Sequence, residues 1–197
     1  VIRIKSEGYN PFTVNLSDIS VQSGNTGTAA IVSGIATSFM DMGVKIGGFD
    51  LYCTSDVICG SGISSSAAFE TLIGTIIDTY YNDNKAGAVE IAKIGQFAEN
   101  VYFGKNSGLM DQMATACGGF VYIDFKNEPT VEKIDFDLAE YGYRLCVTDT
   151  RGSHASLTDE YASITAEMKM IAAHFGKEYL SEIDEDEFYH NIKKLTE

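Results

Sequence analysis

The chain has 197 residues, and its 14 basic and 28 acidic side chains give a formal net charge of −14. Hydrophobic residues make up 45% of the sequence, which excludes a disordered chain because it supplies enough apolar surface for a buried core. The acidic balance argues against binding to nucleic acid or to an anionic membrane, since both require clustered Lys and Arg. A single pocket for a nucleotide remains compatible with this charge.

The distribution of apolar residues, cysteines and histidines excludes further classes. No apolar stretch is long enough to cross a bilayer, and the first residues lack the apolar core of a signal peptide. The three histidines are too scattered for a zinc signature. The four cysteines form no C-x-x-C pair and lie in apolar contexts, which predicts buried, reduced thiols in a cytoplasmic protein.

Hydrophobic periodicity predicts a mixture of strands and helices along the chain. In chain order we expect two strands within 1–18 around a turn at 8–11, a helix over 25–42, a strand over 47–55, helices over 69–80, 86–99 and 108–117, strands over 120–125, 130–136 and 143–150, and helices over 158–175 and 184–195. Strands followed by clustered helices indicate an α+β fold. The Ala-, Gly- and Ser-rich composition of 24–43 predicts close helix packing.

A glycine- and serine-rich segment between the strand over 47–55 and the next helix carries the clearest chemical signal. It reads Cys59-Gly60-Ser61-Gly62-Ile63-Ser64-Ser65-Ser66. Two glycines let the backbone approach a ligand, and serines stand where a helix presents unpaired N–H groups. Such a helix start binds anions, usually phosphate, and the hydroxyl groups are suitable ligands for Mg²⁺.

Three better-known motifs with similar residues are absent from this segment. A Walker phosphate loop would end in Gly-Lys-[Ser/Thr], which this segment lacks. A dinucleotide-binding fold would need Gly or Ala at position 65. A serine hydrolase would need the motif Gly-x-Ser-x-Gly. On these residues alone, an ordinary turn into a serine-capped helix explains the segment equally well.

The stretch over 55–70 resembles the second motif of the GHMP small-molecule kinases, in its galactokinase form. The resemblance implies that the loop wraps the phosphates of ATP through the following residues: Gly60, Ser61, Gly62, Ile63, Ser64, Ser65 and Ser66. The chain departs from the family at Ile58, where Pro is usual, and at Ile63, where Leu is usual. Neither change removes a phosphate donor.

A second stretch, over 104–112, resembles the galactokinase segment that ends Gly-Ile-Met-Asp-Gln. Here the ending is Gly-Leu-Met-Asp-Gln, and Ser107 stands where Cys is common. The resemblance implies that Asp111 contacts the sugar and acts as the general base of phosphoryl transfer. A position near a helix N-terminus favours its ionised form, as that role requires. Taken alone, Asp111 is also compatible with simply opening a helix.

The resemblance implies two further site residues. Glu99, near the end of the preceding predicted helix, takes the place of the family's Mg²⁺-binding Glu, with Ser66 or Ser65 opposite. A third matching stretch, over 149–161, implies that Tyr161 helps to frame the sugar. Arg151 and His154 are weaker candidates, because the loop that carries them departs from the family's Asn-containing pattern.

The family resemblance also implies a domain organisation. Residues 1–138 would form the GHMP kinase N-terminal domain, which has an α+β, ribosomal protein S5 domain 2-like fold, and residues 139–197 would begin the C-terminal domain. The family's first and third motifs would lie upstream of residue 1 and beyond residue 197. We therefore expect an internal part of a longer protein that is catalytically inactive by itself, because half of the positioning groups are missing.

These patterns predict an ATP- and Mg²⁺-dependent kinase that phosphorylates the anomeric hydroxyl of a sugar, with galactose as the leading substrate. The expected partners are ATP and a small sugar, with neither nucleic acid nor a membrane. Three alternatives stay open at this point: a GHMP kinase for another sugar or for an isoprenoid or amino-acid alcohol, a non-catalytic sensor of ATP and sugar, and an unrelated α+β binding module.

Overall fold

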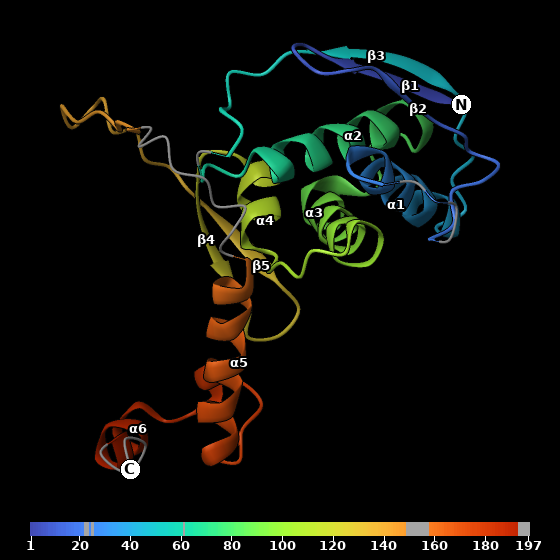
Figure 1. The fold of residues 1–197 in the computed structure, drawn as a ribbon. Helices are drawn as coiled ribbons and strands as arrows, with labels where there is room; N and C mark the ends of the chain where they lie inside the picture. The colour runs from blue at the N-terminus through green and yellow to red at the C-terminus, as the bar shows by residue number, and fades with distance from the viewer. Residues whose placement is uncertain (22–23, 25, 61, 149–157, 193–197) are drawn as a thin grey trace. The chain divides into compact units, whose positions relative to one another are not determined.

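The fold is given by a computed structural model, which describes residues 1–21, 24, 26–60, 62–148 and 158–192 (Figure 1). In chain order its elements are β1 (Ile2–Ser6), β2 (Phe12–Val14), α1 (Thr28–Asp41), β3 (Phe49–Cys53), α2 (Ser65–Tyr81), α3 (Gly87–Phe97), the π-helix η1 (Ala98–Phe103), α4 (Met110–Cys117), β4 (Phe120–Asp124), β5 (Thr130–Ile134), α5 (Thr158–His174), the 3₁₀-helix η2 (Leu180–Glu182) and α6 (Glu185–Asn191). Strands and helices are mixed, as an α+β fold requires.

The chain divides into two compact units. The first consists of Val1–Ile123 and Val131–Ser153, and the second of Asp124–Thr130 and His154–Glu197. In the second unit, the acidic run that precedes α6 begins the helix as predicted, since the Asp184 carboxylate accepts the backbone N–H of Glu187 at 3.0 Å. All the residues that build the candidate site described below belong to the first unit.

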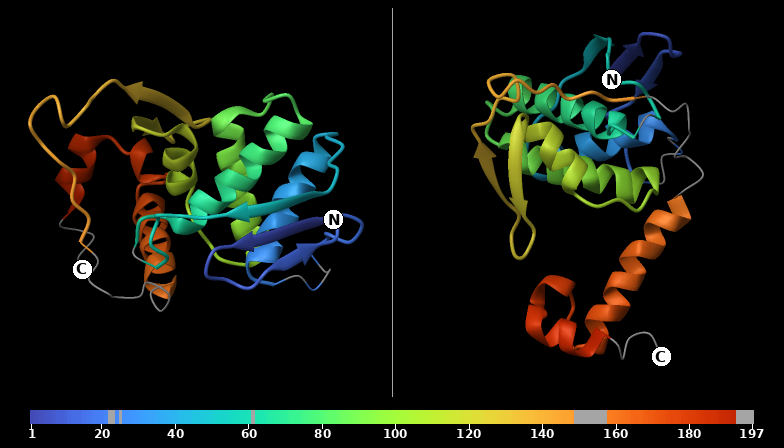
Figure 2. Two further views of the ribbon diagram at one scale, coloured as in Figure 1. Left: turned by 90° about the horizontal axis from the view of Figure 1, so that it is seen from above. Right: turned by 90° about the vertical axis from the view of Figure 1, so that its left-hand side faces the viewer.

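A three-stranded mixed sheet covers one side of the helices in the first unit (Figures 1 and 2). Its order is β2-β1-β3, with β1 antiparallel to β2 and parallel to β3. Residues in β1 alternate between the core and solvent: Ile2 and Ile4 are buried, while Arg3 and Lys5 are exposed. This alternation is the two-residue period that predicted the strand, and it directs one face of the sheet onto the helices.

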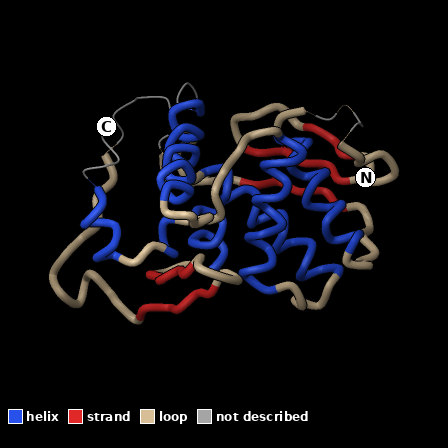
Figure 3. The backbone as a smooth tube through the Cα atoms, turned by 90° about the horizontal axis from the view of Figure 1, so that it is seen from below, coloured by secondary structure: helices blue, strands red, loops and turns tan. Residues whose placement is uncertain are grey.

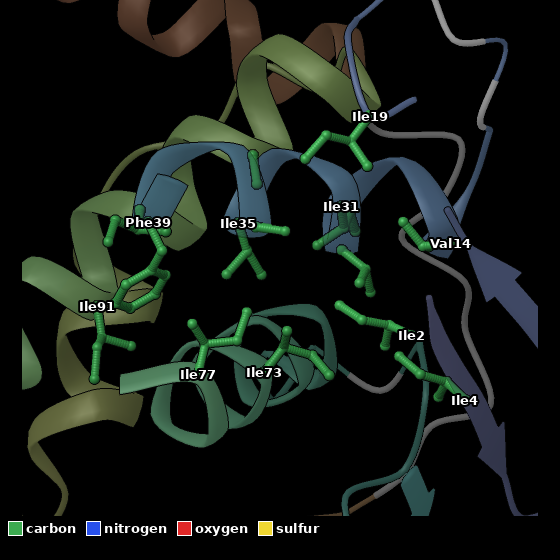
Figure 4. Packing of buried hydrophobic residues seen from close by; sticks show 14 residues of the cluster. Ile2, Ile4, Val14, Ile19, Ile31, Ile35, Phe39, Ile73, Ile77 and Ile91 are labelled. Carbon is green, nitrogen blue, oxygen red and sulfur yellow. The ribbon is translucent and has the colours of Figure 1, made fainter. Parts of the chain in front are cut away.

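The hydrophobic core lies between this sheet and helices α1, α2 and α3. Figure 4 shows the side chains of Ile35 and Phe39 from α1 facing Ile73 and Ile77 from α2, with Ile91 of α3 beside them. Except for Ile91, which is 5% exposed, these side chains are fully buried. The core therefore fixes α2, which carries the glycine- and serine-rich loop at its start.

Glycines allow two close helix contacts in the first unit. A Cβ added to Gly34 of α1 would lie 2.8 Å from the Cβ and 2.9 Å from the Cα of Ala98 in η1. A Cβ added to Gly74 of α2 would lie 2.7 Å from a methyl group of Ile91 in α3. The close packing predicted for the small residues of α1 is thus confirmed, and it fixes the position of η1.

The structure corrects three expectations from the sequence. Residues 143–148 form no strand, because no described strand runs beside them, and β4 and β5 pair only with each other (Figure 3). The helix predicted over 86–99 gives way at Ala98 to a π-helix. The four cysteines are free as expected, but Cys59 and Cys146 are exposed and the other two are only half-buried.

Within the described residues, none of the helices has the length and apolar character needed to span a membrane.

Candidate active site

Three of the described residues in the loop between β3 and α2 have left-handed backbone conformations. Gly60 and Gly62 have φ values of +77° and +80°, which glycine adopts without a steric penalty. Ser64, the N-cap of α2, has φ 61° and ψ 42°, a conformation that costs a residue with a Cβ about 1 kcal/mol or more. The left-handed conformation of Ser64 turns the chain sharply from the loop into α2, as an anion-binding turn requires.

The start of α2 has the polar groups needed to hold an anion. Ser64 makes no side-chain cap hydrogen bond to the helix, and Ser65 and Ser66 in the first turn are half-buried. The first backbone N–H groups of an α-helix have no partner within it, so they attract phosphate. Ile63 is 39% exposed just before the turn. Ser61 lies outside the described residues.

A cavity of about 510 Å³ lies beside this loop. Its walls come from the ends of β1 and β3, from the loop and from the first turns of α2, including Ser6, Cys53, Val57, Ser65 and Phe69. This volume is within the range of small-molecule sites, and the lining combines aliphatic and aromatic groups with hydroxyl groups. The start of α2 therefore borders a space in which a ligand can continue beyond an anionic group.

Helix α4 places one carboxylate toward solvent and the next side chain toward the core. Asp111, in the first turn, is exposed, whereas Gln112 is 1% exposed and Met113 is fully buried. Asp111 is thus available to a ligand, while its neighbours fix the helix that carries it.

A buried hydrogen-bond network ties α4 to two other elements of the site. The Gln112 Nε2 group donates to Glu70 Oε2 of α2 at 3.0 Å and to Glu99 Oε2 of η1 at 3.2 Å. Both glutamates are almost inaccessible, at 0% and 2% exposure. Glu70 follows Ser66 by one helical turn. The network therefore joins the phosphate-loop helix, the Glu99 segment and the Asp111 helix.

Glu99 lies in the first turn of the π-helix and has a cationic partner. Its Oε1 atom accepts a hydrogen bond from Lys105 Nζ at 2.8 Å, so both carboxylate oxygens are engaged. The Lys105 side chain is 43% exposed, unlike the carboxylate that it neutralises. A π-helix often marks a functional segment, and here it brings a buried acid beside the start of α4.

Glu70 is the most strongly perturbed acid of the site. Burial raises the pKa of its carboxyl group from 4.5 to about 7, and the nearby Glu99 charge adds to this effect. The hydrogen bond from Gln112 and the Lys105 charge act in the opposite direction, while Asp111 raises the pKa slightly further. A proton on Glu70 near neutral pH thus limits the negative charge inside the network.

The segment that precedes Asp111 is fixed by Ser107. Its backbone N–H and its hydroxyl group both donate to Asn100 Oδ1, at 2.8 and 3.0 Å. Its carbonyl oxygen accepts hydrogen bonds from Gln96 Nε2 at 3.0 Å and Asn100 Nδ2 at 3.2 Å. Ser107, which departs from the family pattern, therefore holds the 104–109 segment against η1.

The structure describes three of the residues singled out from the sequence on neighbouring elements. Ser66, Glu99 and Asp111 lie on three elements that the Gln112 network connects. Tyr161 falls in α5, and its side chain lies outside the described part of the chain, as do Arg151 and His154. In the portion of the chain that the structure describes, no three His, Cys, Asp or Glu side chains cluster closely enough to hold a metal ion by themselves.

Sequence reasoning missed Glu70, Gln112 and Lys105. Glu70 and Gln112 fall within the two matching stretches, and their signal is a polar side chain on an otherwise apolar helix face. Lys105 has no such signal, because a lysine in a loop is usually a solvated residue.

Comparisons with known proteins agree with this geometry. Residues 30–119 match the family model of the GHMP kinases N terminal domain. A galactokinase of Streptomyces coelicolor is 33% identical over 188 residues, which cover 93% of this chain and 48% of the relative. A galactokinase of Clostridium tetani is 32% identical over 181 residues, which cover 89% of this chain and 46% of the relative.

The chain spans about half the length of the curated relatives it matches. The matched domain contains the glycine- and serine-rich loop, Glu70, Glu99 and Asp111. Its fold is the α+β fold expected from the sequence. Residues 30–119 of the chain thus form a GHMP kinase N-terminal domain, and the curated relatives that the chain matches are galactokinases.

Proposed function

We propose that the protein is an ATP- and Mg²⁺-dependent sugar kinase that phosphorylates the anomeric hydroxyl of galactose. The observation that carries this proposal is the buried Gln112 amide, which bonds to Glu70 on the phosphate-loop helix and to Glu99 on the π-helix. Gln112 directly follows Asp111, so one network fixes the candidate base relative to the candidate phosphate site. Similarity to galactokinases supports galactose as the substrate.

The loop over 60–66 would bind the phosphates of ATP. Positive φ at Gly60 and Gly62 leaves the backbone unobstructed, and the first N–H groups of α2 would hold the phosphate oxygens. The cavity beside the loop would receive the nucleoside, since Ser65 lies both in its wall and in the first turn of α2.

Asp111 would act as the general base. Its exposed carboxylate would accept the proton of the anomeric hydroxyl as the sugar oxygen attacks the γ-phosphorus and the bond from that phosphorus to the β-phosphate oxygen breaks. The products would be a sugar 1-phosphate and ADP. Since phosphoryl transfer depends mainly on positioning and charge stabilisation, the rigid attachment of α4 through Gln112 is the contribution that matters most.

Residues of this chain fit the divalent ion that such a reaction uses. Glu99 is a buried carboxylate that already has a cation, Lys105, against one oxygen, and Ser66 offers a hydroxyl group at the start of α2. Mg²⁺ typically takes one or two protein oxygens and completes its shell with phosphate and water oxygens. When bound, it would neutralise the charge that develops on the transferred phosphoryl group.

Four further points complete the proposal. Tyr161 would frame the sugar. The domain boundary would fall after residue 138, with 1–138 as the N-terminal domain and 139–197 as the beginning of the C-terminal domain. The 197 residues alone would be inactive, because the family's other two motifs are needed to complete the site. A cytoplasmic location fits a kinase that uses ATP and small sugars.

Turnover of ATP by the protein in its full natural length tests this function. We would measure sugar-dependent ADP release with Mg²⁺ across galactose, other hexoses and non-sugar alcohols, with Asp111→Asn alongside. Turnover with galactose that falls by about 10²–10⁴-fold in Asp111→Asn, with ATP binding retained, is the expected result. Binding of ATP and sugar without turnover would identify a sensor instead, and turnover with another alcohol would identify a different GHMP kinase.

A further inference from the structure

An ammonium group occupies the carboxylate to which we assign metal binding. Lys105 Nζ lies 2.8 Å from Glu99 Oε1, the distance of a charge-assisted hydrogen bond. Glu99 is 2% exposed, so this carboxylate has little access to water that would replace the ammonium group. In the described structure Lys105 is therefore the neutralising cation of a buried acid.

The other oxygen of Glu99 cannot easily serve in place of Oε1. Glu99 Oε2 accepts a hydrogen bond from Gln112 Nε2, and the same nitrogen is bound to Glu70 Oε2. Gln112 is 1% exposed and lies in the helix that also carries Asp111. Rotation of the Glu99 carboxylate would break this network, so an incoming cation would approach at Oε1, where Lys105 lies.

Lys105 itself is able to leave. Its side chain is 43% exposed, and its backbone follows Gly104, which ends the π-helix with φ 81°. A flexible four-carbon chain with an ammonium group at a partly exposed position has many other rotamers in water. The pair thus consists of a fixed carboxylate and a movable cation.

We propose that Lys105 is a built-in competitor for the divalent ion at Glu99: its ammonium group balances the buried carboxylate in the free protein and must leave Oε1 before the metal binds there. This inference rests on the proposed role of Glu99 as a metal ligand. It implies that Lys105 raises the divalent-ion concentration that the protein needs. Its removal should therefore improve metal binding, which general damage to the site would not do.

Binding of Mn²⁺ to Lys105→Met in the full-length protein tests the inference. Free Mn²⁺ would be followed by electron paramagnetic resonance, with the non-hydrolysable ATP analogue AMP-PNP present. We expect about tenfold tighter binding than in the wild type, which corresponds to about 1.4 kcal/mol and is typical of one charged hydrogen bond. Lys105→Arg keeps the charge and should bind Mn²⁺ like the wild type.

A second readout uses stability without nucleotide or substrate turnover. In the absence of divalent ions, Lys105→Met should melt below the wild type because the buried Glu99 loses its counter-charge. Added Mn²⁺ should raise the melting temperature of Lys105→Met more than that of the wild type. Lys85→Met is the matched control, because Lys85 pairs at 2.9 Å with Asp83 and both of these side chains are exposed.

Two negative results have different meanings. Equal or weaker Mn²⁺ binding by Lys105→Met, while Glu99→Gln abolishes binding, would overturn the competition and leave the role of Glu99 intact. If Glu99→Gln leaves Mn²⁺ binding unchanged, both in the wild type and in Lys105→Met, then Glu99 is not a ligand of the metal ion. That result would refute the metal assignment of the proposed function and this inference together.

Discussion

Replacement of Glu70 by Gln should change how the stability of the protein depends on pH. Burial raises the pKa of Glu70 from 4.5 to about 7. Between these two values the folded protein keeps a proton that the unfolded chain has released, so the folded state binds more protons. Its free energy of unfolding therefore falls as pH rises through this window and levels off above a pH of about 7.

The size of the effect follows from the pKa difference. Each unit of difference corresponds to about 1.4 kcal/mol, so ionisation of Glu70 should cost the folded state about 3 kcal/mol once the pH exceeds about 8. Glu70→Gln removes this cost. The substituted amide keeps an acceptor for Gln112 Nε2, and its N–H groups replace Glu70 Oε1, a buried oxygen that has no hydrogen-bond partner among the described residues.

Urea unfolding from about pH 5 to about pH 8 would measure this effect in the full-length wild-type and Glu70→Gln proteins. The free-energy difference between them should grow with pH in favour of the variant, since other titrating groups contribute equally to both.

Asp78→Asn is a matched control in the same helix. Asp78 is 2% exposed and accepts N–H groups from Asn82, Ala86 and Gly87, so its replacement should lower stability at neutral pH. A constant difference between Glu70→Gln and the wild type across the range would refute the reasoning.

Other substitutions test the packing and the loop. Gly34→Ala should lower the free energy of unfolding by about 1–3 kcal/mol, because the new Cβ would lie 2.9 Å from the Cα of Ala98. This loss is expected although Ala favours helices more than Gly does. A variant as stable in urea as the wild type, or more stable, would contradict the close contact. Phe39→Ala should cost about 3–5 kcal/mol, since Phe39 is fully buried, and a loss below 1 kcal/mol would mean that the core packs differently. Gly62→Ala should weaken ATP binding in calorimetry because its φ of +80° disfavours a Cβ, whereas unchanged affinity would separate this glycine from the phosphate site.

Local sequence patterns predicted the strands and helices of the first unit well. The alternation of Ile2 and Ile4 with charged residues identified β1, and the spacing of apolar residues identified α1 to α4. The start of α2 was placed too late, at Phe69 rather than Ser65, because the serines of the first turn carry no apolar periodicity. The prediction of a strand over 143–150 was wrong for residues 143–148. Alternation of apolar and polar residues does not by itself provide a neighbouring strand with which to pair.

The candidate site was predictable only as far as family motifs reach. Glycines before a serine-rich helix start indicated an anion site, and Asp111 and Glu99 entered through the resemblance. The network was not predictable, because Gln112 meets Glu70 and Glu99 across 42 and 13 residues of sequence. Such contacts depend on how three helical segments pack. The π-helix was equally hidden, since one wider turn leaves no distinct sequence pattern.

The position of the phosphate on the product tests the central claim most directly. Phosphorus NMR would follow the full-length protein with ATP, Mg²⁺ and galactose, and in parallel its Asp111→Asn variant. We predict that the wild type forms ADP and a sugar phosphorylated at the anomeric oxygen, and that Asp111→Asn forms about 10²–10⁴-fold less of both in the same time. Equal product from Asp111→Asn, or phosphate on another hydroxyl group, would contradict it.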